Sequence, residues 1–190
     1  MRQRLRAPEF DRLYAADPDP WDFATSPYER AKYDATIRAL DGRRFARGLE
    51  LGCSIGVLTE RLAAHCDDLL AVDLADAALT QARARLADLP HVRVERREIP
   101  EEFPAGRFGL IVASEVLYYL DDGALEAAVE AIAAALEPGG SLLAVHWRPH
   151  TRTYPQRGDD VHARLAALGW PAGASERTPR YALDRLDRPA

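Results

Sequence analysis

The sequence LELGCSIGVLT at residues 49–59, read together with AVDL at residues 71–74, decides the fold. An apolar strand runs into a turn that carries Gly52 and Gly56, and a helix is expected to follow. A second short apolar strand ends on Asp73. This β-α-β order is typical of nucleotide-binding folds, in which an acid after the second strand binds ribose hydroxyls. A ligand with an adenosine half would therefore pack against the turn, where a Cβ at Gly52 would intrude.

The turn differs from a dinucleotide fingerprint in two ways. Its glycines are spaced G-x-x-x-G instead of G-x-G-x-x-G, and Glu50 lies two residues before the first of them. A pyrophosphate favours bare helix N–H groups over a neighbouring carboxylate, whereas a cationic ligand favours the acid. S-adenosylmethionine carries adenosine, an α-amino group and a sulfonium, so these residues favour it over NAD. The simpler interpretation is that Glu50 is a solvated strand end and that the turn is tight without binding a ligand. The presence of Asp73 after the second strand favours the cofactor interpretation instead.

Residues 48–147 resemble a class I S-adenosylmethionine-dependent methyltransferase. ELGCSIG at residues 50–56 matches the E-x-G-x-G-x-G motif of that family, with Ser54 in place of the middle glycine. More narrowly, the chain is similar to the nodulation protein S group from about Tyr14 to about His162. That similarity rests on DPW at 19–21, SPYE at 26–29, KY at 32–33 and SEVLYYL at 114–120. Members of the group N-methylate an amino sugar or related small acceptors.

The expected fold is α/β and Rossmann-like, with a mostly parallel seven-stranded sheet. The apolar run at residues 108–113 is typical of a central parallel strand buried on both faces. The resemblance adds an antiparallel C-terminal hairpin, which the sequence places at residues 177–180 and 181–186. We expect a single methyltransferase domain over residues 1–190. Its parts are N-terminal cap helices at 1–47, a cofactor-binding core at 48–147, and a lid loop, helix and terminal hairpin at 148–190.

The resemblance also implies roles for individual residues. It places Tyr33 over the methionine end of the cofactor, an acid such as Glu98 at the adenine amino group, and the apolar Ile99 against the adenine face. Topology places the segment that begins at Ser114 beside the site, because ligands bind outside the carboxyl ends of strands. The expected cofactor-binding residues are Trp21, Tyr28, Tyr33, Glu50, Gly52, Cys53, Ser54, Gly56, Asp73, Leu74, Glu98, Ile99, Ser114, Glu115 and Tyr118.

Two features of the N-terminal part leave alternatives open. Trp21 and Phe23 follow a proline-rich break, and either they fill the core beside the sheet or they form the wall of a ligand pocket. Ser26-Pro27-Tyr28-Glu29 predicts the start of a helix that contains Lys32, the only lysine of the chain. A lone lysine is expected to be a solvated charge, although in a capping helix it could meet the carboxylate of the cofactor.

The composition restricts the classes of function. The chain has 190 residues, a formal net charge of −5 and no basic run, which argues against a nucleic-acid partner. It contains no stretch of 18 apolar residues and no hydrophobic region after its basic N-terminus, so neither a membrane span nor a signal peptide is expected. Cys53 and Cys66 do not form a disulfide framework. We therefore expect a reduced, cytoplasmic protein with a small-molecule acceptor, and the sequence leaves its oligomeric state open.

Methyl transfer from a sulfonium is an in-line displacement, for which the protein must orient the reactants. Aromatic faces near the methyl group stabilise the cation, and the candidates are Trp21, Tyr28, Tyr33, Tyr118 and Tyr119. His146, at the carboxyl end of the last parallel strand, is the first candidate for a base or an acceptor-binding group, and Asp159 and His162 could bind a polar acceptor from the lid side. The structural alternative is a histidine that is satisfied by a backbone carbonyl. No metal site is expected, because Pro149 excludes a helix that would pair His146 with a second histidine.

The preferred hypothesis is S-adenosylmethionine-dependent transfer of a methyl group to a nitrogen or oxygen of a small molecule, with S-adenosylhomocysteine as product. An amino sugar or a secondary-metabolite intermediate is a possible acceptor, and only the resemblance suggests the sugar. The alternatives are a small-molecule O-methyltransferase, an NAD-linked oxidoreductase, and a module that binds S-adenosylmethionine without turnover. The missing middle glycine and Glu50 speak against the oxidoreductase.

Overall fold

The computed structural model describes residues 3–190, which form a seven-stranded sheet in the order β3-β2-β1-β4-β5-β7-β6. The strands are β1 (Phe45–Leu51), β2 (Cys66–Asp73), β3 (Val92–Arg96), β4 (Phe108–Ser114), β5 (Leu136–Trp147), β6 (Ala172–Arg177) and β7 (Tyr181–Asp187). The helices are α1 (Ala7–Ala16), α2 (Pro27–Arg38), α3 (Val57–Leu62), α4 (Asp76–Arg85), α5 (Asp122–Ala135) and α6 (Gly158–Ala166), with 3₁₀ turns at Ala63–His65 and Leu117–Tyr119. Among the described residues, no helix is long and apolar enough to cross a bilayer. Strands β1 to β5 pair in parallel and β7 runs antiparallel to β5 and β6, which confirms the predicted fold class.

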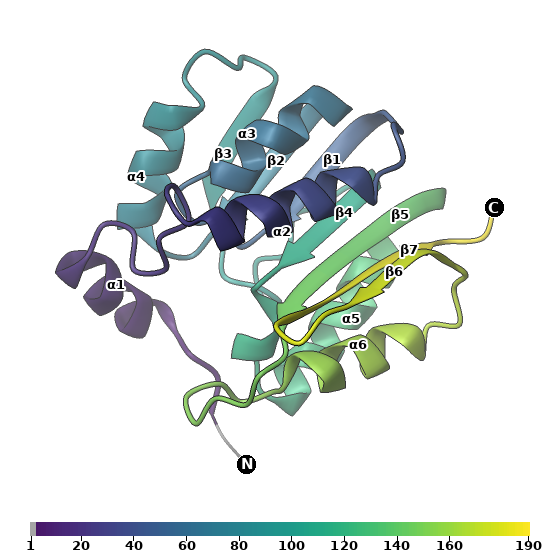
Figure 1. Cartoon of the computed structure of the whole chain (residues 1–190). Helices are drawn as coiled ribbons and strands as arrows, with labels where there is room; N and C mark the ends of the chain where they lie inside the picture. The colour runs from purple at the N-terminus through teal and green to yellow at the C-terminus, as the bar shows by residue number, and fades with distance from the viewer. Residues whose placement is uncertain (1–2) are drawn as a thin grey trace.

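Helices cover both faces of the sheet, with α2, α3 and α4 on one side and α5 and α6 on the other (Figure 1). The sequence of β4 explains its central place. Leu110, Ile111 and Val112 are fully buried, and alternate side chains enter opposite layers. Leu110 and Val112 pack with α2 and α3, whereas Ile111 packs with α5 and α6. A strand between two apolar layers shows no polar alternation, so the prediction of a central buried strand at residues 108–113 is confirmed.

The direction of strand addition reverses at β1. The chain goes from β1 to β2 on one side, and β4 later pairs with β1 on the other. The carboxyl ends of β1 and β4 therefore border a crevice, which is where ligands bind in open α/β sheets. Helix α1 lies beyond this edge, where Phe10 and Tyr14 pack on Ile55 and Ala75 of the turns after β1 and β2. The N-terminal segment thus covers one end of the crevice.

The connection from β5 to α6, at residues 148–157, contains no helix or strand. We keep the name lid loop for this segment, and its role as a lid stays a prediction. The ring of Tyr154 in this loop stacks on that of Tyr118, with the ring centroids 4.6 Å apart. At the end of the loop, Gly158 packs so closely on β5 that a Cβ there would overlap the carbonyl oxygen of Trp147. The loop therefore folds over the 3₁₀ turn at Leu117–Tyr119, and it leaves β5 and enters α6 at neighbouring points.

The terminal hairpin is present, but the predicted position of its first arm is wrong. That arm is β6, at Ala172–Arg177, whereas residues 177–180 mainly connect β6 to β7. β6 is an exposed edge strand of small and polar residues. It has no apolar face, so the alternation that identifies a half-buried strand is missing from its sequence.

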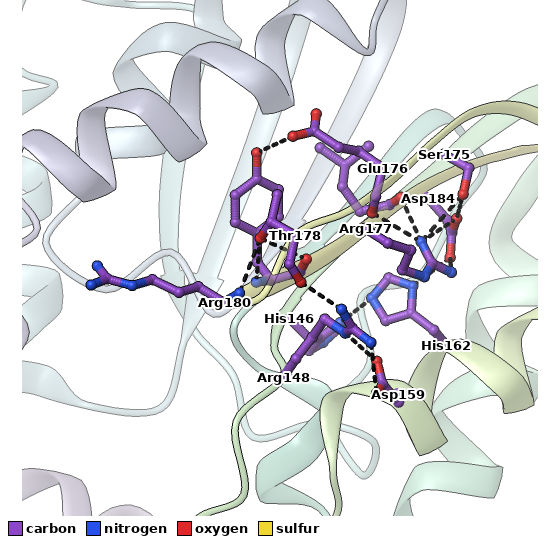
Figure 2. Close-up of polar contacts among 12 residues, drawn as sticks. His146, Arg148, Asp159, His162, Ser175, Glu176, Arg177, Thr178, Arg180 and Asp184 are labelled. Atoms are coloured by element: carbon purple, nitrogen blue, oxygen red, sulfur yellow. Dashed lines mark hydrogen bonds and ion pairs between the residues drawn. The ribbon is translucent and has the colours of Figure 1, made fainter.

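A chain of buried polar side chains joins β5, α6 and β7 (Figure 2). The Nε2 atom of His146 accepts the N–H of Leu117 at 3.3 Å, and its Nδ1 lies 3.2 Å from Nε2 of His162. The Nδ1 atom of His162 lies 2.5 Å from the carboxylate of Asp184, which also accepts from Arg177. Because Nε2 of His146 is an acceptor, its proton is on Nδ1 and is donated to His162, which in turn donates to Asp184. Both imidazoles are satisfied in their neutral forms.

The hydrogen bonds that link His146, His162 and Asp184 predict that the free energy of unfolding depends on pH. Burial, together with the positive charges that His162 and Lys32 can carry, holds the pKa of His146 well below its usual value. The unfolded chain therefore binds this proton more readily than the native state, and the free energy of unfolding falls as the pH drops below about 6.5, by up to about 1.4 kcal/mol per pH unit. Urea unfolding from about pH 7 to about pH 5 measures the slope.

Two variants separate His146 from the carboxylates that also titrate in this range. His146→Gln should flatten the slope, whereas His150→Gln, at an exposed position of the lid loop, should retain it. An equal slope in the parent and in His146→Gln would contradict the assignment.

Candidate active site

Asp73 ties together the two turns at the carboxyl edge of the sheet. Its Oδ2 accepts the N–H of Ser54 at 2.8 Å, and its Oδ1 accepts the N–H of Ala75 at 3.0 Å. Ser54 has a left-handed backbone with φ of 50°, at the position where the motif expects glycine. The bond to Asp73 and a contact of 2.5 Å between the hydroxyls of Ser54 and Tyr14 hold this conformation. A carboxylate has about four acceptor sites, so Asp73 retains capacity for a ligand.

Glu50 is buried beside the same turn, with only 2% of its surface exposed. Its Oε2 makes no hydrogen bond within residues 3–190. Burial raises the pKa of this carboxyl to about 7. An arriving ammonium group would supply the missing partner and favour the ionised form. The site therefore fits a ligand with a positively charged amino group, which an α-amino acid moiety provides.

Gly52 is the point of closest backbone approach. It has a φ of 73°, and a Cβ at this position would lie 2.8 Å from the side chain of Val116. Glycine is thus required both by the backbone conformation and by the space. Its absence of a side chain keeps open the crevice between the turn after β1 and the segment after β4.

Three adjoining cavities open at this edge, and we name them by their position. The outer cavity is lined by Trp21, Asp73, Leu74, Glu98, Ile99, Val116 and Tyr119, among others. The turn cavity is lined mainly by Tyr33, Glu50, Gly52, Cys53, Ser54 and Ser114. The aromatic cavity, of about 360 Å³, is lined by Trp21, Phe23, Ser26, Tyr28, Glu29, Lys32, Glu115, Tyr118, Tyr119, Trp147 and Tyr154. Glu115 and Phe23 line all three, so the cavities meet at these two side chains, of which only Glu115 is charged.

Most residues expected to bind the cofactor line the outer cavity or the turn cavity. Three do not: Tyr28 and Tyr118 line only the aromatic cavity, and Gly56 begins α3 with a φ of 81°. Glu98 lines the outer cavity, but its carboxylate also lies 3.7 and 3.5 Å from the guanidinium groups of Arg4 and Arg6. The roles of the individual residues remain predictions.

Of the two alternatives left open for the aromatic residues after α1, the structure favours the pocket wall. Trp21 and Phe23 are stacked with their ring centroids 5.5 Å apart. Both are only partly buried, and both line the outer and the aromatic cavities.

The prediction that Lys32 is a solvated charge is wrong, because only 2% of it is exposed. Its Nζ donates to Glu29 at 3.0 Å and to Glu115 at 2.6 Å. Burial of an ammonium group is tolerated when carboxylates pair with it. Glu29 stands three residues before Lys32, so both share a helix face, and this spacing was the available local signal. The second partner, Glu115, lies 83 residues away in the chain and leaves no local pattern.

Glu115 is fixed at the junction by four contacts. Its Oε1 accepts from Lys32, and its Oε2 accepts from the hydroxyl of Tyr118 at 2.6 Å and from the N–H of Trp147 at 2.9 Å. Its own N–H donates to the carbonyl of Val145 at 2.8 Å. These contacts hold Glu115 in a left-handed conformation with φ of 56°, which a non-glycine residue adopts only when its surroundings enforce it.

The structure contradicts the prediction that His146 is a base that faces the acceptor. His146 is fully buried and both ring nitrogens are engaged: Nε2 accepts the N–H of Leu117, and Nδ1 contacts His162 in the polar chain of Figure 2. His162 is part of the same chain, and Asp159 is bound to Arg148 at 2.7 Å. None of these three lines the cavities, whereas Tyr119 lines two of them. Within residues 3–190 no group of three or more histidine, cysteine or acidic side chains is arranged to hold a metal ion.

The reason for the error is strand alternation. Leu142 and Ala144 of β5 pack in the layer of α5 and α6, so His146 points to that layer as well. The next residue, Trp147, lines the aromatic cavity instead. The sequence correctly places β5 at the site, but the cavity-lining side chain is one residue further along. Tyr154, from the lid loop, was also missed, because its position depends on how the loop folds back.

Comparisons with known proteins identify the family of the chain and agree with its fold. The family model of nodulation protein S (NodS) matches residues 9–150. A nodulation protein S from Rhizobium tropici is 36% identical over 135 residues, which cover 70% of this chain and 56% of that protein. A ubiquinone biosynthesis O-methyltransferase from Bordetella avium is 34% identical over 144 residues, with coverage of 70% and 57%.

A solved structure extends the likeness over nearly the whole chain. The N-methyltransferase NodS from Bradyrhizobium japonicum WM9, in complex with S-adenosyl-L-homocysteine, superposes with a TM-score of 0.87 at 28% identity and covers 97% of this chain and 98% of that one. The chain spans little more than half the length of the curated relatives above. With a family match over most of its length and the same fold as a solved member, the chain belongs to the nodulation protein S family.

Proposed function

We propose that the protein transfers the methyl group of S-adenosylmethionine to an amine nitrogen of a small-molecule acceptor, such as an amino sugar or a secondary-metabolite intermediate. The observation that carries this proposal is the meeting of three cavities at Glu115. Two of them contain the residues suited to the cofactor, and the third is left for the acceptor. Such an arrangement brings two substrates together at one point, which is the main requirement of an in-line displacement.

The cofactor would occupy the outer cavity with its adenosine half and the turn cavity with its amino-acid half. Asp73 would bind the ribose hydroxyls, Ile99 would pack on adenine, and Glu50 would pair with the α-amino group. When bound there, S-adenosylmethionine supplies an electrophilic methyl group on a positively charged sulfur. The junction at Glu115 would lie nearest to this charge, and its carboxylate would stabilise it.

The aromatic cavity favours a nitrogen acceptor over an oxygen acceptor. Its charged side chains are Glu29, Lys32 and Glu115, which together leave one net negative charge when both carboxylates are ionised. An alkylammonium group balances that charge, whereas a neutral alcohol does not. The rings of Tyr28, Trp147 and the neighbouring tyrosines offer π faces on which a cation or a sugar ring can pack.

The reaction itself is tested by incubation with S-adenosylmethionine labelled in the methyl group and a panel of acceptors. Glucosamine and simple amines should acquire label, and matched alcohols should not. Transfer to the alcohols alone would indicate an O-methyltransferase. Tight binding of S-adenosylhomocysteine with no transfer to either class would indicate a binding module.

The cofactor site predicts a large effect for Asp73→Asn. The substitution removes a charged acceptor that the ribose hydroxyls and the Ser54 N–H share, and lost hydrogen bonds to a charged group correspond to about 1.5–3 kcal/mol. The dissociation constant of S-adenosylhomocysteine, measured by calorimetry, should therefore rise about ten- to a hundredfold. Asp76→Asn is the matched control, because Asp76 lies in the first turn of α4 with its side chain 75% exposed. Unchanged affinity in Asp73→Asn would refute this placement of the cofactor, and a thermal melt shows whether that variant is folded.

A further inference from the structure

The two carboxylates of the aromatic cavity differ in what surrounds them. Glu115 already accepts hydrogen bonds from Lys32, the hydroxyl of Tyr118 and the N–H of Trp147. Among the described residues, the carboxylate of Glu29 has Lys32 as its one donor, with Nζ 3.0 Å from Oε1 and 2.8 Å from Oε2. A carboxylate offers about four acceptor sites. Glu29 therefore has free acceptor capacity inside the cavity, whereas Glu115 is used in holding the junction together.

The position of Glu29 is unusual for a charged residue. It lies in the first turn of α2, on the face that also buries Lys32, Tyr33 and Thr36, and only 7% of it is exposed. A solvent-facing glutamate three residues before a lysine would be an ordinary surface pair. Here the pair is turned inward, to a cavity whose other lining residues are mostly aromatic. Replacement of a buried ion pair by apolar residues is often neutral or stabilising, so the presence of this pair in the cavity points to a functional role for Glu29.

We propose that Glu29 is the catalytic residue that takes the proton from the amine of the acceptor, and that Lys32 and Glu115 position its carboxylate. This inference rests on the proposed function. An amine reaches the cavity as an ammonium ion, which has no lone pair and cannot attack a methyl group. One N–H proton moves to the Glu29 carboxylate, which becomes a neutral carboxyl, and the amine becomes neutral as well. Charge is conserved, because a cation and an anion become two neutral groups.

The remaining bonds balance in the same way. The nitrogen lone pair forms the new N–C bond to the methyl group while the S–C bond breaks, and that electron pair stays on sulfur. The product is a methylated ammonium ion and the neutral thioether S-adenosylhomocysteine. Glu29 returns its proton to solvent when the product leaves.

The charges around Glu29 suit this exchange. The groups that face it are Lys32 on its own helix, Glu115 after β4, and Asp19 in the segment before α2. Burial raises the pKa of Glu29, while Lys32 opposes the rise and Glu115 and Asp19 add to it. A carboxylate whose pKa is raised is a better proton acceptor than a solvated one. Lys32 remains an ammonium, because Glu115 and Glu29 raise its pKa against the effect of burial, so it does not compete for the proton.

A binding experiment with sinefungin tests the inference without knowledge of the acceptor. In this analogue a carbon that bears an amino group replaces the sulfur and its methyl, so its ammonium would lie at the entrance of the aromatic cavity. Calorimetry should show that the parent binds sinefungin more tightly than S-adenosylhomocysteine. In Glu29→Gln this preference should fall about tenfold, with the affinity for S-adenosylhomocysteine unchanged. In the parent the preference should also weaken as the pH falls and Glu29 becomes protonated.

Further variants make each outcome decisive. Glu29→Asp retains a carboxylate and should keep part of the preference even if Glu29→Gln folds poorly. Glu126→Gln, the same chemical change at an exposed position of α5, should keep all of it. An unchanged preference in Glu29→Gln, or a preference lost only in Glu115→Gln, would overturn the assignment of Glu29. If the parent binds neither ligand, the proposed function fails instead.

Kinetics distinguish a proton acceptor from a mere anion at the site. With glucosamine as acceptor, Glu29→Gln should lose about a hundredfold in kcat/KM near neutral pH. The loss should shrink as the pH rises past the pKa of the amine, because a neutral amine needs no base. A loss that stays constant with pH would show that Glu29 has only a structural role. If the parent does not methylate glucosamine, the amino-sugar acceptor is wrong, and the sinefungin comparison still decides the role of Glu29.

Discussion

The hydrogen bonds from Ser54 and Ala75 to the carboxylate of Asp73 are the constraint on which the site depends. They join the turn after β1 to the turn after β2, and so fix the edge of the crevice before any ligand is present. The same bonds explain how a serine can stand in a left-handed position where the motif has glycine. Asp73 is thus both a building element of the turn and a candidate ligand group, and these two uses of one side chain cannot be separated by sequence.

Local patterns in the sequence were sufficient for the core of the fold. The glycine spacing at residues 52–56, the acid at the end of β2 and the unbroken apolar run of β4 each lie within one short segment, and each predicted its element correctly. Periodicity works in these places because a buried parallel strand must be apolar on both faces. It failed for β6, where an exposed edge strand has no apolar face to reveal it.

The parts of the site that could not be predicted depend on contacts between distant segments. Lys32 is buried because Glu115, far away in the sequence, closes over it. His146 and Trp147 are neighbours, and only the register of β5 decides which of them reaches the cavity. A shift of one residue exchanges the two faces of a strand, so a correct strand assignment still left the wrong side chain at the site. A sequence pattern can identify a strand without showing which of its side chains faces the site. In such cases the structure is needed to assign catalytic roles.

The way in which the lid loop is anchored has a consequence for the range of acceptors. Trp147 donates its N–H to Glu115, and Gly158 packs on the carbonyl of Trp147, so the loop at residues 148–157 leaves β5 and enters α6 at two adjacent points. The loop reaches the aromatic cavity through Tyr154 alone. An insertion or an exchange between these anchors would reshape one wall of the cavity while the cofactor crevice keeps its form. A change in this loop is thus a route to altered acceptor binding that leaves the turns after β1 and β2 in place.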